Sequence, residues 1–213
     1  MSLTGYRTKR DVAADLLREA ILGGELAPGT RLILDELSAR YKVSLTPIRE
    51  ALSQLEREGF VTQAAHRGAM VAALDRDELL ELYAIRSAIE ELATLHGVPR
   101  LTDRDLATMG QLLDAMEAFK GSWDAFLDID LQFHRTLYGA AGSRRWLDTI
   151  EALWRRSRRY MLSSTSVSGA VATLHSDHRA IYQSCCAKDV PAAAAAIRAH
   201  LQQSEERLLR DWT

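Results

Sequence analysis

The chain has 213 residues, of which 47% are hydrophobic and 26% charged, and only 12 glycines and 4 prolines interrupt it. This composition excludes a disordered chain and is typical of a helix-rich globular protein with one or two domains. The net charge of −2 also argues against a protein that is simply one basic nucleic-acid-binding surface.

The first 74 residues predict three helices followed by a small hairpin. Apolar residues at spacings of three and four predict helices over 9–22, 34–41 and 44–58. The runs FVTQ (60–63) and MVAAL (70–74) are typical of short strands, joined by a turn that contains Gly68. This order predicts a winged helix-turn-helix domain over residues 1–74.

Beyond Asp75 the pattern is helical throughout. The periodicity and the breaks between periodic segments predict helices at about 76–97, 103–119, 122–139, 144–163, 169–187 and 190–211. Six helices of this length predict an antiparallel bundle, which we assign as a second domain over residues 75–213. We therefore expect a mainly α protein.

Membrane segments are not expected. No run approaches the roughly 18 apolar residues that a membrane span requires, and the start MSLTGYRTKRD lacks the apolar core of a signal peptide. We expect a cytoplasmic protein with no membrane partner.

The third predicted helix, in the stretch VSLTPIREAL, has two faces with different chemistry. Ile48, Ala51, Leu52 and Leu55 can pack inward, so that the polar residues around the start of the helix stay exposed. A recognition helix presents such groups to base edges and phosphates. An ordinary core helix remains the alternative for this stretch taken alone. With the wing, the residues predicted to contact DNA are Ser44, Thr46, Arg49, Ser53, His66 and Arg67.

Residues 34–71, LDELSARYKVSLTPIREALSQLEREGFVTQAAHRGAMV, resemble the winged helix-turn-helix of GntR-type bacterial transcription regulators. The resemblance implies a regulator that binds double-stranded operator DNA, and we expect it to act as a homodimer. Two positions depart from the family pattern, because Leu45 replaces a usual arginine and Asp35 replaces a frequent cation. An arginine contact to guanine is therefore unavailable at Leu45, whose apolar side chain could contact a thymine methyl group instead.

The second domain contains residues with metal-ligand chemistry. Asp130 and His134 are four residues apart, so both project from one face of a helix, and His178 and His200 lie on two further helices. Imidazole and carboxylate together suit a divalent transition metal, for which we expect zinc, with nickel and manganese as alternatives. On spacing alone, an exposed ion pair or a hydrogen-bonded core histidine remains open.

From about Asp75 to Arg210 the chain resembles the helical FCD ligand-binding domain of the FadR and VanR branches of this family. The matching segments are IRSAIEELA, DLQFHRTL, DHRAI and IRAHL. The resemblance implies a metal held by Asp130, His134, His178 and His200 that anchors a small carboxylic acid. His175 is expected to be a nearby polar residue. Arg86 matches a family arginine near the cavity, and contact with the acid and an ion pair with Glu90 are both open for it.

Two functions compete, and a third interpretation involves no ligand. The first is a transcriptional repressor whose affinity for its operator is controlled by the acid. The second is a metal-dependent hydrolase, because three histidines and an aspartate can activate water. The sequence contains no HExxH motif, nucleophile elbow or phosphate loop to support it. The third is a helical scaffold, which would leave the histidines scattered and exposed.

Overall fold

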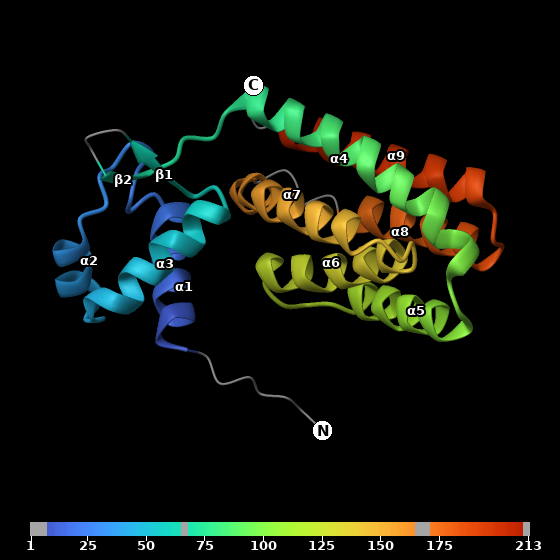
Figure 1. Ribbon diagram of the computed structural model, residues 1–213, viewed down its shortest axis with the longest axis horizontal. Helices are drawn as coiled ribbons and strands as arrows, with labels where there is room; N and C mark the ends of the chain where they lie inside the picture. The colour runs from blue at the N-terminus through green and yellow to red at the C-terminus, as the bar shows by residue number, and fades with distance from the viewer. Residues whose placement is uncertain (1–7, 65–67, 165–170, 211–213) are drawn as a thin grey trace. The chain divides into compact units, whose positions relative to one another are not determined.

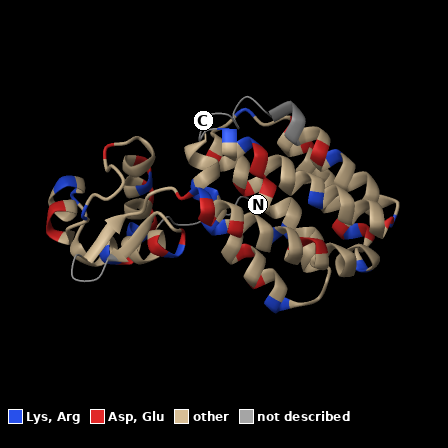
Figure 2. Ribbon diagram, turned by 90° about the horizontal axis from the view of Figure 1, so that it is seen from above, with Lys and Arg blue, Asp and Glu red and all other residues tan. Residues whose placement is uncertain are grey.

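The computed structural model describes residues 8–64, 68–164 and 171–210, which form a mainly helical protein (Figure 1). The chain divides into two compact units, residues 1–74 and 75–213. Within the described ranges, no helix is long and apolar enough to cross a membrane. Basic and acidic residues are interspersed along the helices of both units (Figure 2), so charge alone does not single out a binding surface.

The first unit is a winged helix-turn-helix, as predicted. It contains α1 (Lys9–Leu22), α2 (Leu34–Tyr41), α3 (Leu45–Arg57), β1 (Val61–Ala64) and β2 (Gly68–Val71). The apolar face of α3 packs on α1 and α2, with Ile48, Ala51, Leu52 and Leu55 buried. This packing leaves the opposite side of α3 exposed at the surface of the unit.

The hairpin differs from the prediction in the bounds of its second strand. The second strand was expected over 70–74, but β2 begins at Gly68 and ends at Val71. The reason is the pairing with β1, in which Val61, the first residue of that strand, lies opposite Val71. Residues 72–74 therefore have no strand residue opposite them. The other edge of β2 is closed by the turn before α2, where the Leu32 amide donates to the Ala69 carbonyl at 2.8 Å.

The second unit contains the six predicted helices and a short 3₁₀ turn at Val98–Arg100. The helices are α4 (Arg76–Gly97), α5 (Asp103–Glu117), α6 (Trp123–Gly139), α7 (Arg144–Ser163), α8 (Val171–Cys186) and α9 (Val190–Leu209). Several begin at a side chain that accepts a hydrogen bond from a first-turn amide, as Asp75, Thr102 and Asp189 do. Figure 1 shows α9 running beside α4, the pair with the most extensive packing.

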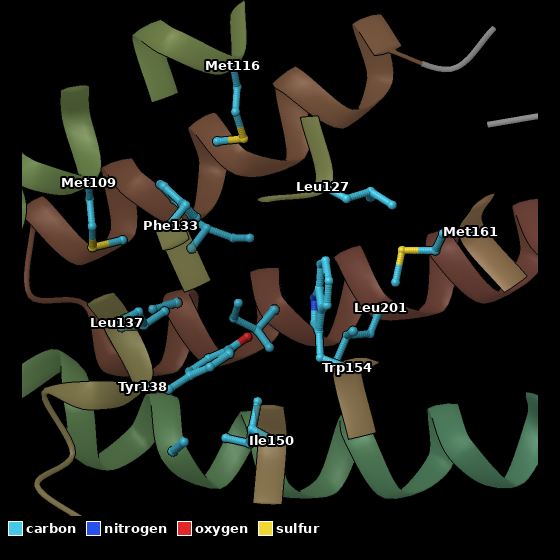
Figure 3. Close-up of a cluster of buried hydrophobic side chains, with 14 of the residues drawn as sticks. Met109, Met116, Leu127, Phe133, Leu137, Tyr138, Ile150, Trp154, Met161 and Leu201 are labelled. Carbon is cyan, nitrogen blue, oxygen red and sulfur yellow. The ribbon is translucent and has the colours of Figure 1, made fainter. Parts of the chain in front are cut away.

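The core of the second unit is one continuous apolar cluster to which all six helices contribute. Met109, Phe133, Tyr138 and Trp154 point into the space between the helices (Figure 3). Buried polar side chains lie among these apolar ones, and several of them form the site described below.

Close helix packing generates a testable difference between two glycines. A Cβ atom at Gly97, the last residue of α4, would lie 2.5 Å from the Leu137 carbonyl oxygen, whereas one at Gly139 would meet no atom within 4 Å. We expect Gly97→Ala to lower the free energy of unfolding by about 1–3 kcal/mol, because backbone must move to accommodate the methyl group. Gly139→Ala is the control and should leave it unchanged or slightly higher. Urea unfolding of both variants measures this, and equal stabilities would contradict the close approach.

Candidate metal centre

The four predicted ligands come together inside the second unit. One potential ligand atom from each of Asp130, His134, His178 and His200 lies within 4.8 Å of those of the others, and we call this group the His/Asp cluster. Asp130 and His134 lie one turn apart on α6, His178 lies on α8 and His200 on α9. All four are buried and lie together, whereas the scaffold interpretation expected scattered and exposed histidines.

Two of the three donor-atom distances in the cluster are close to the spacing of ligands around an ion, and the third is that of a direct contact between Asp130 and His178. Nε2 of His134 lies 3.2 Å from Nε2 of His178, and Oδ1 of Asp130 lies 2.6 Å from the His178 nitrogen and 3.6 Å from that of His134. Zinc–nitrogen bonds of 2.0–2.1 Å in a tetrahedron separate neighbouring ligand atoms by about 3.3 Å. Three imidazoles and a carboxylate therefore fit a divalent transition ion.

The protonation states of Asp130 and His200 also suit the binding of a metal ion. Burial alone would raise the pKa of Asp130, but its contacts with His178 and His134 outweigh burial and hold the pKa well below its usual range. Burial lowers the pKa of His200 to about 4, and the neighbouring His178 and His134 add to this effect. An ionised carboxylate and a neutral imidazole are the forms that bind metal ions.

A second layer of buried groups orients His134. The Tyr138 hydroxyl donates to Oε2 of Glu90 at 2.7 Å, and Nδ1 of His134 lies 3.2 Å from the same hydroxyl oxygen. Because the tyrosine proton is directed at Glu90, the oxygen accepts from Nδ1 of His134, which leaves Nε2 as the lone-pair nitrogen facing the cluster. Burial and the charge of Glu90 raise the pKa of Tyr138 well above its ordinary value, so the hydroxyl keeps its proton.

Arg86 forms an ion pair with Glu90, which was one of the two roles that the sequence allowed for it. Its Nε donates to Oε1 of Glu90 at 2.7 Å, and both side chains are at least 95% buried. Glu90 thus binds Arg86 with one oxygen and Tyr138 with the other. The sequence offered Glu90 as a partner of Arg86, but it missed Tyr138, which lies one helical turn after His134.

A small cavity adjoins the cluster. It has a volume of about 30 Å³, and Asp130 and His200 lie in its wall. The sequence prediction included Arg86, which also lines it, but missed Tyr83, Ser204 and Arg207. Trp123, Phe126 and Trp154 form much of the remaining wall. The cavity thus combines two guanidinium groups with aromatic surface, which suits a small molecule that carries a carboxylate.

The hydroxyl of Tyr83 is a further polar group at this cavity. It is buried and makes no hydrogen bond of good geometry within the described ranges. Arg207 lies 3.5 Å from Oδ2 of Asp177 and donates to the Ser204 hydroxyl at 3.2 Å. Tyr83 lies on α4, and Ser204 and Arg207 lie on α9. Only the packing of these helices brings the three side chains to the cavity, so their spacing in the sequence did not predict it.

The predicted DNA-contacting residues of the first unit lie on the open side of α3. Ser44, Thr46, Arg49 and Ser53 are all exposed, and Leu45 is 40% exposed. Arg49 and Ser53 line an open groove together with Arg31, a cation that the sequence prediction did not include. His66 and Arg67 lie outside the described residues.

Known proteins share both units. A model of bacterial regulatory proteins of the gntR family matches residues 9–71, and a model of the FCD domain matches residues 81–203. The HTH-type transcriptional repressor GlaR of Escherichia coli is 30% identical over 210 residues, covering 94% of this chain and 92% of that protein. The Nta operon transcriptional regulator of Aminobacter aminovorans is 32% identical over 186 residues, covering 85% and 86%.

Among solved structures, E. coli McbR/YncC has a TM-score of 0.74 at 23% identity and covers 97% of this chain and 99% of its own. At this identity the likeness shows a shared fold.

Two adjacent glutamates provide a matched test of the buried ion pair. Glu90→Ala leaves the Arg86 charge buried without its partner, so we expect the free energy of unfolding to fall by about 3–5 kcal/mol. Glu91 pairs with Arg198, which is half exposed, and Glu91→Ala should cost about 0–1 kcal/mol. Chemical denaturation of both variants measures the difference. Similar losses would show that the Glu90 pair is not the stronger constraint.

Proposed function

The chain belongs to the GntR family of bacterial regulatory proteins and carries an FCD domain, and on that basis we propose that it is a homodimeric repressor whose binding to operator DNA is controlled by a small carboxylic acid. It is a DNA-binding transcription regulator, as its relatives are, and not an enzyme. The hydrolase interpretation is therefore set aside. The repressor assignment is supported by GlaR and by the E. coli repressor RspR, which is 28% identical over 193 residues.

The observation that carries the proposal is the His/Asp cluster beside a cavity with two arginines. Asp130, His134, His178 and His200 would hold the ion, for which zinc is proposed, with nickel and manganese as alternatives. A bound divalent ion would supply the positive charge that attracts a carboxylate. Arg86 and Arg207 bind and orient the acid, and the aromatic wall excludes water from it.

The first unit binds the operator through α3. Arg49 and Ser53 are exposed at the groove, and Ser44 and Thr46 are exposed at the helix start, where free amides attract phosphate. Leu45 offers an apolar contact to a thymine methyl group. His66 and Arg67 remain predicted wing contacts. A homodimer would place two such helices on the two half-sites of a palindromic operator.

The last turn of α7 contacts both the cavity and the first residues of the second unit. Met161 lines the cavity, and its carbonyl accepts a hydrogen bond from Nε1 of Trp123 at 3.0 Å. The neighbouring Tyr160 donates to the Asp75 carbonyl at 3.1 Å, where the chain enters α4 from the first unit. An acid that repositions Met161 would therefore alter a contact at this entry point, which is how occupancy of one site changes the affinity of the other.

DNA binding is tested by two arginines at opposite ends of α3. We expect Arg49→Ala to weaken binding to DNA from upstream of the gene by about 1–3 kcal/mol, because Arg49 reads a base. Arg57→Ala, an exposed cation in the last turn, removes the same charge and should have a smaller effect. A gel-shift titration measures both affinities. If the two variants bind equally well, Arg49 does not contact a base.

Metal binding is tested on purified protein by elemental analysis. The double variant His134→Ala/His178→Ala removes two of the four proposed ligands, so its metal content should fall from about one ion per chain to near zero. His175→Ala is the control, because His175 lies three residues before His178 and outside the cluster. Circular dichroism verifies that the variants are folded. Equal metal content in the double variant and the control would refute the site.

A further inference from the structure

A carboxylate outside the proposed ligand set lies between the His/Asp cluster and the cavity. Oδ2 of Asp177, on α8, lies 3.8 Å from Nδ1 of His200 and 3.5 Å from Nη2 of Arg207. The Asp177 side chain is only 10% exposed. A carboxylate buried to this extent is stabilised by the donors and charges around it. The two neighbours of Asp177 therefore indicate what it does in the site.

The two neighbours of Asp177 belong to different parts of the site. His200 is a proposed ligand of the ion, whereas Arg207 lines the adjoining cavity. Both lie on one face of α9, because seven residues complete about two turns of a helix. Ser204, on the same face between them, accepts a hydrogen bond from Nη2 of Arg207 at 3.2 Å. From the neighbouring helix α8, Asp177 thus contacts both a ligand of the ion and a cation of the cavity.

The contact with Asp177 bears on which nitrogen of His200 is available to an ion. An ionised carboxylate only accepts hydrogen bonds, so it favours the neutral tautomer of His200 that carries its proton on Nδ1. Nε2, on the other side of the ring, then keeps the lone pair. His134 and His178 already approach each other through their Nε2 atoms. With this tautomer, all three imidazoles of the cluster offer the same ring nitrogen.

From these contacts we infer that Asp177 is a positioning residue, which holds His200 with Nε2 toward the ion and shares its carboxylate with Arg207 of the cavity. The inference rests on the proposed metal site. A carboxylate that accepts from Nδ1 fixes the orientation of the ring and makes it a more basic ligand.

Arg207 competes with His200 for this carboxylate. Both distances to Oδ2 of Asp177 are longer than the 2.7–3.2 Å of a well-formed N–H···O hydrogen bond. A closer contact with one donor can therefore form at the expense of the other. A group that draws Arg207 away would leave the carboxylate to His200 and strengthen the binding of the ion.

The affinity of the metal-free, full-length chain for Zn²⁺ tests the role of Asp177. Asp177→Asn keeps the size of the side chain but removes its charge, so we expect the affinity to fall by about 10–100-fold. Glu206→Gln is the control, because it removes the same charge at an exposed position next to Arg207 in the sequence. Competition with a chelator of known affinity measures both. The visible spectrum of the Co²⁺-loaded chains, which depends on the ligands and their geometry, should change only in Asp177→Asn.

The outcomes separate this inference from the proposed function. A wild-type chain that takes up neither Zn²⁺ nor Co²⁺ would refute the metal site itself. Wild-type affinity and an unchanged spectrum in Asp177→Asn would refute only the role of Asp177. A lower affinity with an unchanged Co²⁺ spectrum would also overturn it, because Asp177 would then stabilise the fold without positioning His200.

A double-mutant cycle tests the competition between Arg207 and His200. Arg207→Gln frees the Asp177 carboxylate for His200, so we expect the affinity for Zn²⁺, measured without any acid, to rise by about 2-fold or more. The same substitution in an Asp177→Asn background should give a smaller gain, because the shared carboxylate is absent. Equal gains in the two backgrounds would show that Arg207 acts on the ion directly, and would overturn the shared contact.

Discussion

The ion pair between Arg86 and Glu90 is the constraint on which the second unit depends. Both charges are almost completely buried within one turn of α4, where neither is stable without the other. Because Glu90 also accepts the Tyr138 hydroxyl, the pair fixes the hydrogen bond that sets the tautomer of His134. The guanidinium stays at the cavity wall, next to the His/Asp cluster. A single buried carboxylate thus supports the fold, the orientation of a proposed ligand and the charge of the proposed acid-binding site.

The sequence predicts the helices and the shared face of Asp130 and His134 because both depend on local regularity, whereas His178 and His200 were assigned from the family resemblance. Apolar spacing marks α3 and the six bundle helices, and the Asp130–His134 spacing fixes a shared face before any packing is known. The position of β2 was wrong by two residues at its start and three at its end, since strand register depends on the partner strand. Tyr83, Tyr138 and Arg207 could not be assigned, because they meet the site only through the packing of α4, α6 and α9. The resemblance to a family supplied the choice of His178 over His175, which spacing alone left undecided.

The candidate binding groups of the two units lie in different physical environments. Around α3 the groups are exposed, and their charges are mixed with those of neighbouring residues, so affinity for DNA depends on a few placed contacts and on salt. Around the His/Asp cluster the groups are buried, and each charge is held by a named partner. The second environment has the lower dielectric constant, where an added carboxylate changes local energies by more than it would at the surface. Under the proposed function, this asymmetry would allow a small acid to control a much larger DNA interface.

Under the proposed function, helix α4 would limit how the recognition of acids can evolve. Its buried side carries Arg86 and Glu90, its exposed side carries Ile85, Leu92 and Leu95, and its start joins the first unit at Asp75. At 1.5 Å per residue it forms a rod of about 33 Å, so a substitution that rotates or shifts it acts on all three at once. Trp123, Phe126 and Leu208 line the same cavity from α6 and α9. Relatives that respond to other acids are therefore expected to vary at such wall positions and to keep the α4 side of the cavity unchanged.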